Sequence, residues 1–161
     1  MSRASVPRMR SVRVPPLLGV ILVGLGVLVA GAGAQPPGPP VDMRHRLMVP
    51  GPARDMVLAE MRRMLESVNA ILHALPANDL TAIERAARAS GLAMAADVDP
   101  QLRDRLPPPF LQLGMATHRG FDELADEVNA GGTREQALAA LGRITSNCVA
   151  CHAIYRLDES R

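Results

Sequence analysis

The chain has 161 residues, which is enough for one domain, and a formal net charge of +2. All eighteen of its basic residues are arginine, and four of them stand among the first thirteen positions. The residues from Gln35 onward hold fourteen arginines against sixteen acidic side chains, a net charge of −2. This mildly acidic part has no basic cluster and three aromatic residues, so its composition argues against nucleic acid as a partner.

Residues 1–34 have the pattern of a secretory signal peptide. The four arginines precede an uncharged run from Leu17 to Ala30, which is shorter than the about 20 residues that span a bilayer. Ala32 and Ala34 then offer an A-x-A cleavage site. We therefore expect cleavage near Ala34, export to the periplasm, and no membrane attachment afterwards. A retained membrane anchor is the alternative interpretation of the same run.

Residues 35–52 read as a Pro/Gly-rich N-terminal tail. The stretch begins with Gln-Pro-Pro-Gly-Pro-Pro, which lacks periodicity, and Pro50-Gly51-Pro52 is expected to end any helix before it. We place everything before Ala53 outside the core or draped over it, and residues 53–161 in a single domain.

Two amphipathic helices are predicted first in this domain. The pattern of apolar residues at spacings of three and four runs from Ala53 to Leu75, and Pro76 ends it. The second helix opens at the capping residues Asn78 and Asp79 and continues through Met94.

Two further helices complete the domain, and no segment reads as a strand. The third follows the prolines at 107–109 and ends at Gly131-Gly132. The fourth begins with a capping box at residues 133–136 and continues through Tyr155. Short loops between four such helices predict an all-α fold, an antiparallel up-down-up-down four-helix bundle. Alanine is abundant on the inner faces, and we expect the small side chains to leave space that a large apolar cofactor fills.

The motif that carries chemistry is Cys148-Val-Ala-Cys151-His152. On a helix, residues three apart lie on one face about 5–6 Å from each other. Two thiols so placed can add to the two vinyl groups of one porphyrin, and the next residue projects its imidazole toward the iron. C-x-x-C-H is the attachment signature of c-type haem. The motif therefore predicts one covalently bound haem c with its iron, in agreement with export.

Three other readings of the cysteine pair are weaker. A disulfide would close a very small loop and constrain little. A thioredoxin-like redox pair needs a βαβ context, which this pattern lacks. A structural zinc site needs four ligands and would have to recruit His45, His73 or His118 from across the fold.

The segment Cys148-Val-Ala-Cys151-His152-Ala-Ile-Tyr155-Arg156 resembles the C-x-x-C-H-x-x-[FY]-R ending of the class II cytochromes c, the family of cytochrome c′ and its low-spin relatives. The resemblance is specific only at this motif. Over the rest of residues 53–156 it is limited to the predicted arrangement of helices. It implies a haem near the C-terminal end of the last of four helices. It also implies that Cys148 and Cys151 form the thioethers, that His152 is the proximal iron ligand, and that Arg156 is the basic residue beside it. A helix continued through Arg156 would place that guanidinium one turn after His152, near the imidazole or a haem propionate.

The resemblance leaves the distal side of the iron open, because the first helix of the family faces it. A methionine there gives a six-coordinate, low-spin haem suited to electron transfer, and an apolar residue gives a five-coordinate haem that binds small gases. Met61 is the favoured ligand, because Leu58-Ala-Glu-Met61-Arg62 resembles the helix of relatives that we take to be methionine-ligated. Met64 and Met56 are the other candidate ligands. For all three methionines, the alternative role is to fill gaps in the core without binding iron.

Two further residues keep other distal arrangements open. Arg54 matches an arginine that lies one turn before the distal apolar residue of cytochrome c′, which would then be Leu58 and would favour gas binding. His118 could be a second iron ligand or could contact a propionate.

These patterns predict a periplasmic mono-haem electron carrier that exchanges electrons with redox partner proteins. The alternative is a cytochrome c′-type protein that binds nitric oxide or carbon monoxide, and a third hypothesis is a zinc or thiol structural module. No catalytic dyad or nucleophile arrangement is visible, so we do not expect an enzyme. Members of the family often form homodimers through their first two helices, which the apolar breadth of the first predicted helix permits.

Overall fold

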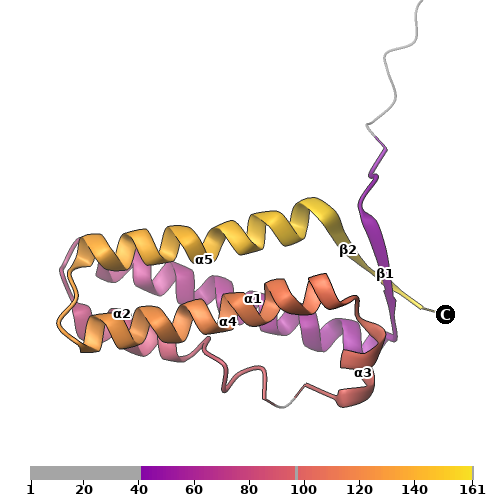
Figure 1. Ribbon diagram of the computed structural model, residues 1–161, viewed down its shortest axis with the longest axis horizontal. Helices are drawn as coiled ribbons and strands as arrows, with labels where there is room; N and C mark the ends of the chain where they lie inside the picture. Colours follow the sequence, from indigo (N-terminus) through magenta and orange to yellow (C-terminus); the bar gives the residue numbers. More distant parts are fainter. Residues whose placement is uncertain (1–40, 97, 161) are drawn as a thin grey trace, which may run out of the picture. The chain divides into compact units, whose positions relative to one another are not determined.

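The computed structural model describes residues 41–96 and 98–160, and this part of the chain is mostly helical (Figure 1). The signal peptide predicted for residues 1–34 and the start of the predicted tail lie outside the described residues. The elements in chain order are β1 (His45–Val49), α1 (Gly51–Ala74), α2 (Leu80–Arg88), α3 (Pro100–Arg105), α4 (Pro108–Asn129), α5 (Arg134–Ile154) and β2 (Tyr155–Glu159).

The main core is formed by the four longest helices. α2 packs against both α1 and α4, and α4 packs against α5. Figure 1 shows α4 and α5 running alongside each other, with the short helix α3 at the end of the molecule where the strands lie. Buried apolar residues from all four helices meet in this core: Ile71, Ala74, Ile83, Ala87, Phe121, Leu124, Ala125, Val128, Ala137, Ala140, Leu141 and Ile144.

Three of the alanines on the inner faces lie in closely packed parts of the molecule. Ala87, Ala125 and Ala137 are completely buried in the main core, where a small side chain lets two helix backbones approach closely. The cavity described below is lined by other residues, chiefly larger apolar side chains.

The predicted helix ends are largely confirmed by capping contacts. Asp79 caps α2 by accepting a hydrogen bond from the backbone N–H of Ala82 at 2.9 Å. Thr133 and Gln136 form the reciprocal capping box of α5. α4 begins among the prolines at 107–109 and ends before Gly131, which adopts a positive φ of 90° that favours glycine.

The second predicted helix is too long. α2 ends at Arg88, and residues 89–96 form turns in place of a continued helix. The physical reason lies in a tertiary contact, because the carboxylate of Asp122 on α4 accepts a hydrogen bond from the backbone N–H of Leu92 at 2.8 Å. The segment then forms α3, a six-residue helix capped by Asp99 that the sequence pattern did not reveal.

The prediction that the chain has no strand is wrong. β1 and β2 pair as a two-stranded parallel sheet in which His45 lies opposite Tyr155 and Leu47 opposite Leu157. Parallel strands require a long connection, and here the connection comprises all five helices. β2 follows directly on α5, so the helix predicted to continue through Tyr155 ends at Ile154.

Residues before Ala53, which we expect outside the core or draped over it, include two that are buried in a second apolar cluster. Leu47 and Val49 pack there with Leu102, Leu106 and Phe110. α1 starts at Gly51, because proline is tolerated in the first helical turn. The compact unit that contains the helices begins at Val41.

Neighbouring residues of β1 test this burial, because Leu47 is 7% exposed and Met48 is 49% exposed. We expect Leu47→Ala to lower the free energy of unfolding by about 2–5 kcal/mol through lost burial and a residual cavity. Met48→Ala should change it by less than about 0.5 kcal/mol. Urea unfolding of the two variants measures the difference, and equal midpoints for both would show that β1 does not belong to the core.

α5 is long and apolar enough to cross a membrane by length and composition. In this fold, however, one face of the helix completes the main core through Ala140, Leu141 and Ile144. Its C-terminal end, with both cysteines, lies beside the second apolar cluster and defines the candidate site.

Candidate functional site

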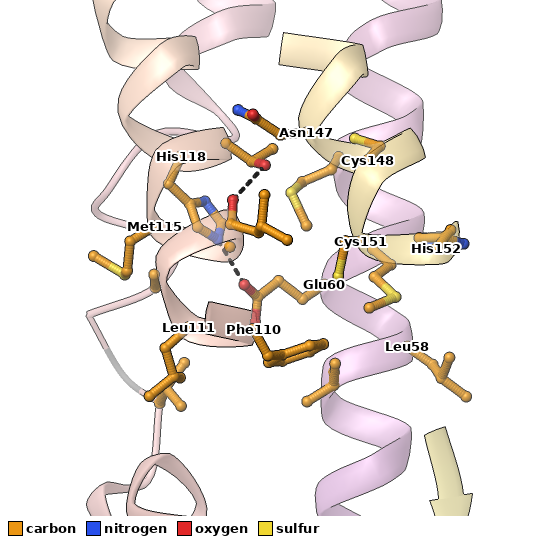
Figure 2. Close-up of a pocket in the computed structure, with 18 of the residues that line it drawn as sticks. Leu58, Glu60, Phe110, Leu111, Met115, His118, Asn147, Cys148, Cys151 and His152 are labelled. Atoms are coloured by element: carbon orange, nitrogen blue, oxygen red, sulfur yellow. Dashed lines mark hydrogen bonds and ion pairs between the residues drawn. The ribbon is translucent and has the colours of Figure 1, made fainter. Parts of the chain in front are cut away.

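A cavity of about 490 Å³ lies among α1, α3, α4 and α5. Its volume is within the about 300–1,000 Å³ typical of sites for small molecules and cofactors. The lining is mainly apolar, with contributions from Val57, Leu102, Phe110 and Phe121 among others. Figure 2 shows residues of α4 on one side of this space and residues of α5 and α1 on the other.

The C-x-x-C-H motif reaches the cavity from the last two turns of α5. Cys148, Cys151 and His152 all line it. Both cysteines are free and half-buried, and burial raises the pKa of each thiol. His152 is exposed to solvent as well as lining the cavity. The helical spacing inferred from the sequence is therefore present, with both thiols and the imidazole next to one apolar space.

The surroundings of the thiols bear on two of the three alternative readings of the pair, the thioredoxin-like redox pair and the zinc site. Thiols of redox-active pairs have lowered pKa values, often because they lie at the N-terminus of a helix. Cys148 and Cys151 lie near the C-terminal end of α5, where burial raises their pKa. Within residues 41–96 and 98–160, no three His, Cys, Asp or Glu side chains gather as a metal site, as a structural zinc would require.

α1 supplies another part of the lining. Leu58, Met61 and Met64 line the cavity. Met61 packs against the second apolar cluster together with Cys151, whereas Met64 packs against the main core. Met56, the third methionine considered, is exposed and does not line the cavity. The structure thus brings Met61 and Leu58 to the site together.

His118 lies beside the cavity with its ring held by other residues of the protein. The imidazole is 2% exposed and lines the cavity from α4, but both ring nitrogens have partners within the protein. Nδ1–H donates to the carbonyl oxygen of Ser90 at 2.8 Å, and Nε2 lies 2.7 Å from Oε1 of Glu60. In this arrangement His118 ties α4 to α1 and presents neither nitrogen to a ligand in the cavity.

These contacts change the acidity of His118 in opposite directions. Burial lowers its pKa, while the hydrogen bonds to Glu60 and Ser90 raise it, and the net effect is a pKa above the ordinary value of 6.5. Folding therefore shifts the protonation equilibrium of this ring toward the protonated form, in which both ring nitrogens can donate.

The raised pKa predicts how the contribution of His118 to stability depends on pH. Because the folded-state pKa lies above the unfolded value of 6.5, the stabilising effect is complete below that value and is lost as the pH rises through the folded-state pKa. We expect the difference in free energy of unfolding between wild type and His118→Gln to shrink with rising pH. Urea unfolding over this range measures it, with His73→Gln, an exposed histidine of α1, as the control. A difference that does not change with pH would contradict the prediction.

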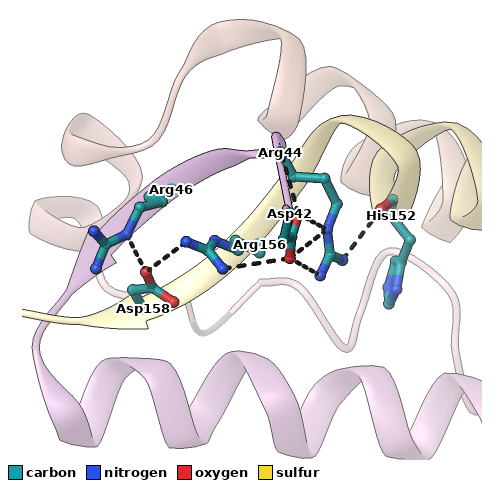
Figure 3. Close-up of polar contacts among 6 residues, drawn as sticks. All are labelled: Asp42, Arg44, Arg46, His152, Arg156 and Asp158. Carbon is teal, nitrogen blue, oxygen red and sulfur yellow. Dashed lines mark hydrogen bonds and ion pairs between the residues drawn. The ribbon is translucent and has the colours of Figure 1, made fainter. Parts of the chain in front are cut away.

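Arg156 lies on β2 and not on the helix, so its expected place one turn after His152 on the same helix face is wrong. Its Nη1 lies 3.3 Å from Oδ2 of Asp42, and its Nη2 lies 3.8 Å from Oδ2 of Asp158 (Figure 3). The guanidinium is not part of the cavity lining. Its Nε is buried and lacks a hydrogen-bond partner among the described residues.

The ion-pair cluster around Arg156 also reaches the backbone of His152. Arg44 pairs with Asp42 at 2.7 Å and donates from Nη1 to the carbonyl oxygen of His152 at 3.3 Å (Figure 3). The hydrogen bonds from Arg44 hold the pKa of the Asp42 carboxyl well below its usual range. The segment before β1 is thereby attached to the end of α5 at the histidine of the motif.

The sequence did not single out several residues that shape the site. Glu60, Met115 and Asn147 line the cavity, and α3 covers part of it through Leu102, Arg103 and Leu106. Glu60 was visible as a charge on the apolar face of the first predicted helix, directly before Met61. α3 gave no comparable signal, because six residues are too few to show helical periodicity.

No protein-family model matches the chain, and no curated protein or solved structure shows significant similarity to it.

Proposed function

We propose that this chain is a periplasmic mono-haem c-type cytochrome that transfers electrons, built on a four-helix bundle of the class II type. The observation that carries the proposal is the convergence of Cys148, Cys151 and His152 on one apolar cavity, with Met61 contributed to the same cavity by another helix. A porphyrin is large and apolar over most of its surface, which suits a lining of this composition. Export to the periplasm rests on the predicted signal peptide.

Each residue of the motif has a distinct task in this proposal. Cys148 and Cys151 would each hold the cofactor through a thioether, formed when the thiol adds across one vinyl group and its hydrogen goes to the neighbouring carbon. His152 would provide an imidazole to the iron, and Met61 a thioether sulfur. A bound haem c would supply reversible one-electron chemistry at iron, with a potential set by its ligands and surroundings.

Other residues of the chain hold this arrangement in place. Arg44 fixes the backbone carbonyl of His152, which restrains the helix end that carries the imidazole. Phe110 and Leu106 are buried apolar residues of the lining, in the cluster against which Cys151 packs. An apolar surrounding of this kind would limit reorganisation when the charge on iron changes.

A gas-binding protein with a five-coordinate haem is the second candidate. It is favoured by Leu58, which lines the same cavity as Met61, one turn earlier on α1. If the leucine side chain faces the iron, the distal side has no protein ligand and stays open to nitric oxide or carbon monoxide.

An optical spectrum with and without carbon monoxide separates the two functions. For the electron carrier we expect a low-spin spectrum that carbon monoxide does not change in the reduced protein. A high-spin spectrum with ready carbon monoxide binding would instead support the gas-binding protein. Exported protein that is colourless after expression with an intact maturation pathway would overturn both.

A further inference from the structure

Glu60 and His118 connect two helices across the cavity. The imidazole of His118 comes from α4 and its Nε2 lies 2.7 Å from Oε1 of Glu60 on α1, as Figure 2 shows. The carboxylate is largely buried, with 19% of its side chain exposed. Nδ1–H of His118 donates to the carbonyl of Ser90, two residues beyond the end of α2. A charged group in such an apolar lining is stable only when it is paired, and His118 provides the partner.

Ser90, which accepts the hydrogen bond from His118, also contacts α1 at a second position. The hydroxyl of Ser90 donates to Oγ of Ser67 at 2.8 Å, and both serines are buried. Glu60 and Ser67 are seven residues apart, which is about two turns of an α-helix, so they lie on nearly the same face of α1. α1 is therefore attached at two points along one face, to α4 and to the segment that follows α2.

Directional contacts matter on α1 because part of its surface faces the cavity. Apolar contacts have no preferred direction, so the apolar lining of the cavity does not by itself fix the rotation of α1 about its axis. Leu58, Met61 and Met64 all line this cavity. Rotation of α1 about its axis changes which of these three side chains points farthest into the cavity.

We propose that Glu60 and His118 are positioning residues that set the rotation of α1 so that Met61, the neighbour of Glu60 in the chain, directs its sulfur into the cavity. The inference rests on the proposed function, since it concerns the ligand of a haem iron. When the pair is broken, Leu58 and Met64 compete for the place of Met61. A fraction of the molecules then loses the methionine ligand.

The variant Glu60→Ala tests this proposal in the purified, haem-loaded protein. We expect the fraction of reduced protein that binds carbon monoxide to rise about tenfold, the factor that corresponds to the loss of one charge-assisted hydrogen bond. The sulfur-to-iron charge-transfer band of the ferric protein should weaken in parallel. Glu60→Gln should restore both signals to nearly wild-type values, because its amide oxygen still accepts a hydrogen bond from Nε2–H of His118.

A second variant and two controls complete the experiment. His118→Leu removes the other partner and should give the same change, so the test stands if one of the two variants does not fold. Glu66→Ala removes an exposed carboxylate of α1, and Ile83→Val destabilises the main core without touching the pair. Both controls should give the wild-type spectrum.

The outcomes distinguish this proposal from the proposed function. If Glu60→Ala leaves the spectrum of a methionine-ligated haem unchanged, or if Ile83→Val shifts it equally, the positioning role is overturned and the cytochrome function stands. A wild-type haem without a methionine band also overturns the positioning role. A wild-type protein without covalent haem overturns both.

Discussion

Exported protein in which Cys148 and Cys151 are both replaced by serine is expected to carry no covalent haem. The physical reason is that the two thiols are the groups of this cavity that can form thioethers, and a hydroxyl does not add to a vinyl group under the same conditions. The wild-type protein should have the mass of the cleaved chain plus one haem and should stain for haem in a denaturing gel. The double variant should have the mass of the cleaved chain alone.

The matched control for this experiment is Val149→Ala. Val149 stands between the two cysteines and is exposed, so its truncation leaves the thiols and the cavity intact. We expect it to retain a full complement of haem. Covalent haem in the double cysteine variant, or a wild-type mass equal to that of the bare chain, would refute the assignment of the motif.

The second large effect is expected for Met61→Leu, which should convert a low-spin haem into a high-spin haem that binds carbon monoxide almost completely when reduced. Leucine has a similar volume to methionine and retains the apolar lining, but it has no sulfur to bind iron, so the sixth coordination position opens. Optical spectra of the ferric and ferrous protein measure the change, and the reduction potential should shift with it.

Two methionines of the same helix provide controls for Met61→Leu. Met56→Leu should leave the spectrum unchanged, because Met56 is exposed and does not line the cavity. Met64→Leu should also leave it unchanged, because Met64 packs against the main core. If Met64→Leu gives the high-spin spectrum and Met61→Leu does not, the distal ligand lies one turn further along α1. If neither variant alters a high-spin wild-type spectrum, the gas-binding alternative gains support.

Helices with strong local signals were predicted from sequence with good accuracy. The capping box at Thr133, the cap at Asp79 and the prolines before Phe110 each placed a helix start within a few residues of its position in the structure. Such signals succeed because a cap satisfies backbone N–H groups of its own helix turn and needs no distant partner. The shortening of α2 was not predictable in this way, because it depends on Asp122, a residue of another helix.

The strands show the opposite case, in which a local alternation of residues exists but is too short to predict a strand by itself. Leu47 and Val49 alternate with polar or exposed residues, as Tyr155 and Leu157 do in β2. Five residues of alternation are weak evidence for a strand. The partner strand is more than one hundred residues away in the chain, and a parallel pair exists only after the intervening helices have packed.

The sequence by itself determined the helical class of this protein and the spacing of Cys148, Cys151 and His152 on one helix, because that spacing follows from local helix geometry alone. The tertiary structure decided what surrounds these residues. Met61 and Leu58 line the cavity, whereas Met56 does not. Arg156 lies on β2 and not on the helix. Both ring nitrogens of His118 are hydrogen-bonded, to Glu60 and to Ser90. These outcomes depend on how separate helices are rotated and where they end, and both are fixed by contacts between residues that lie far apart in the chain.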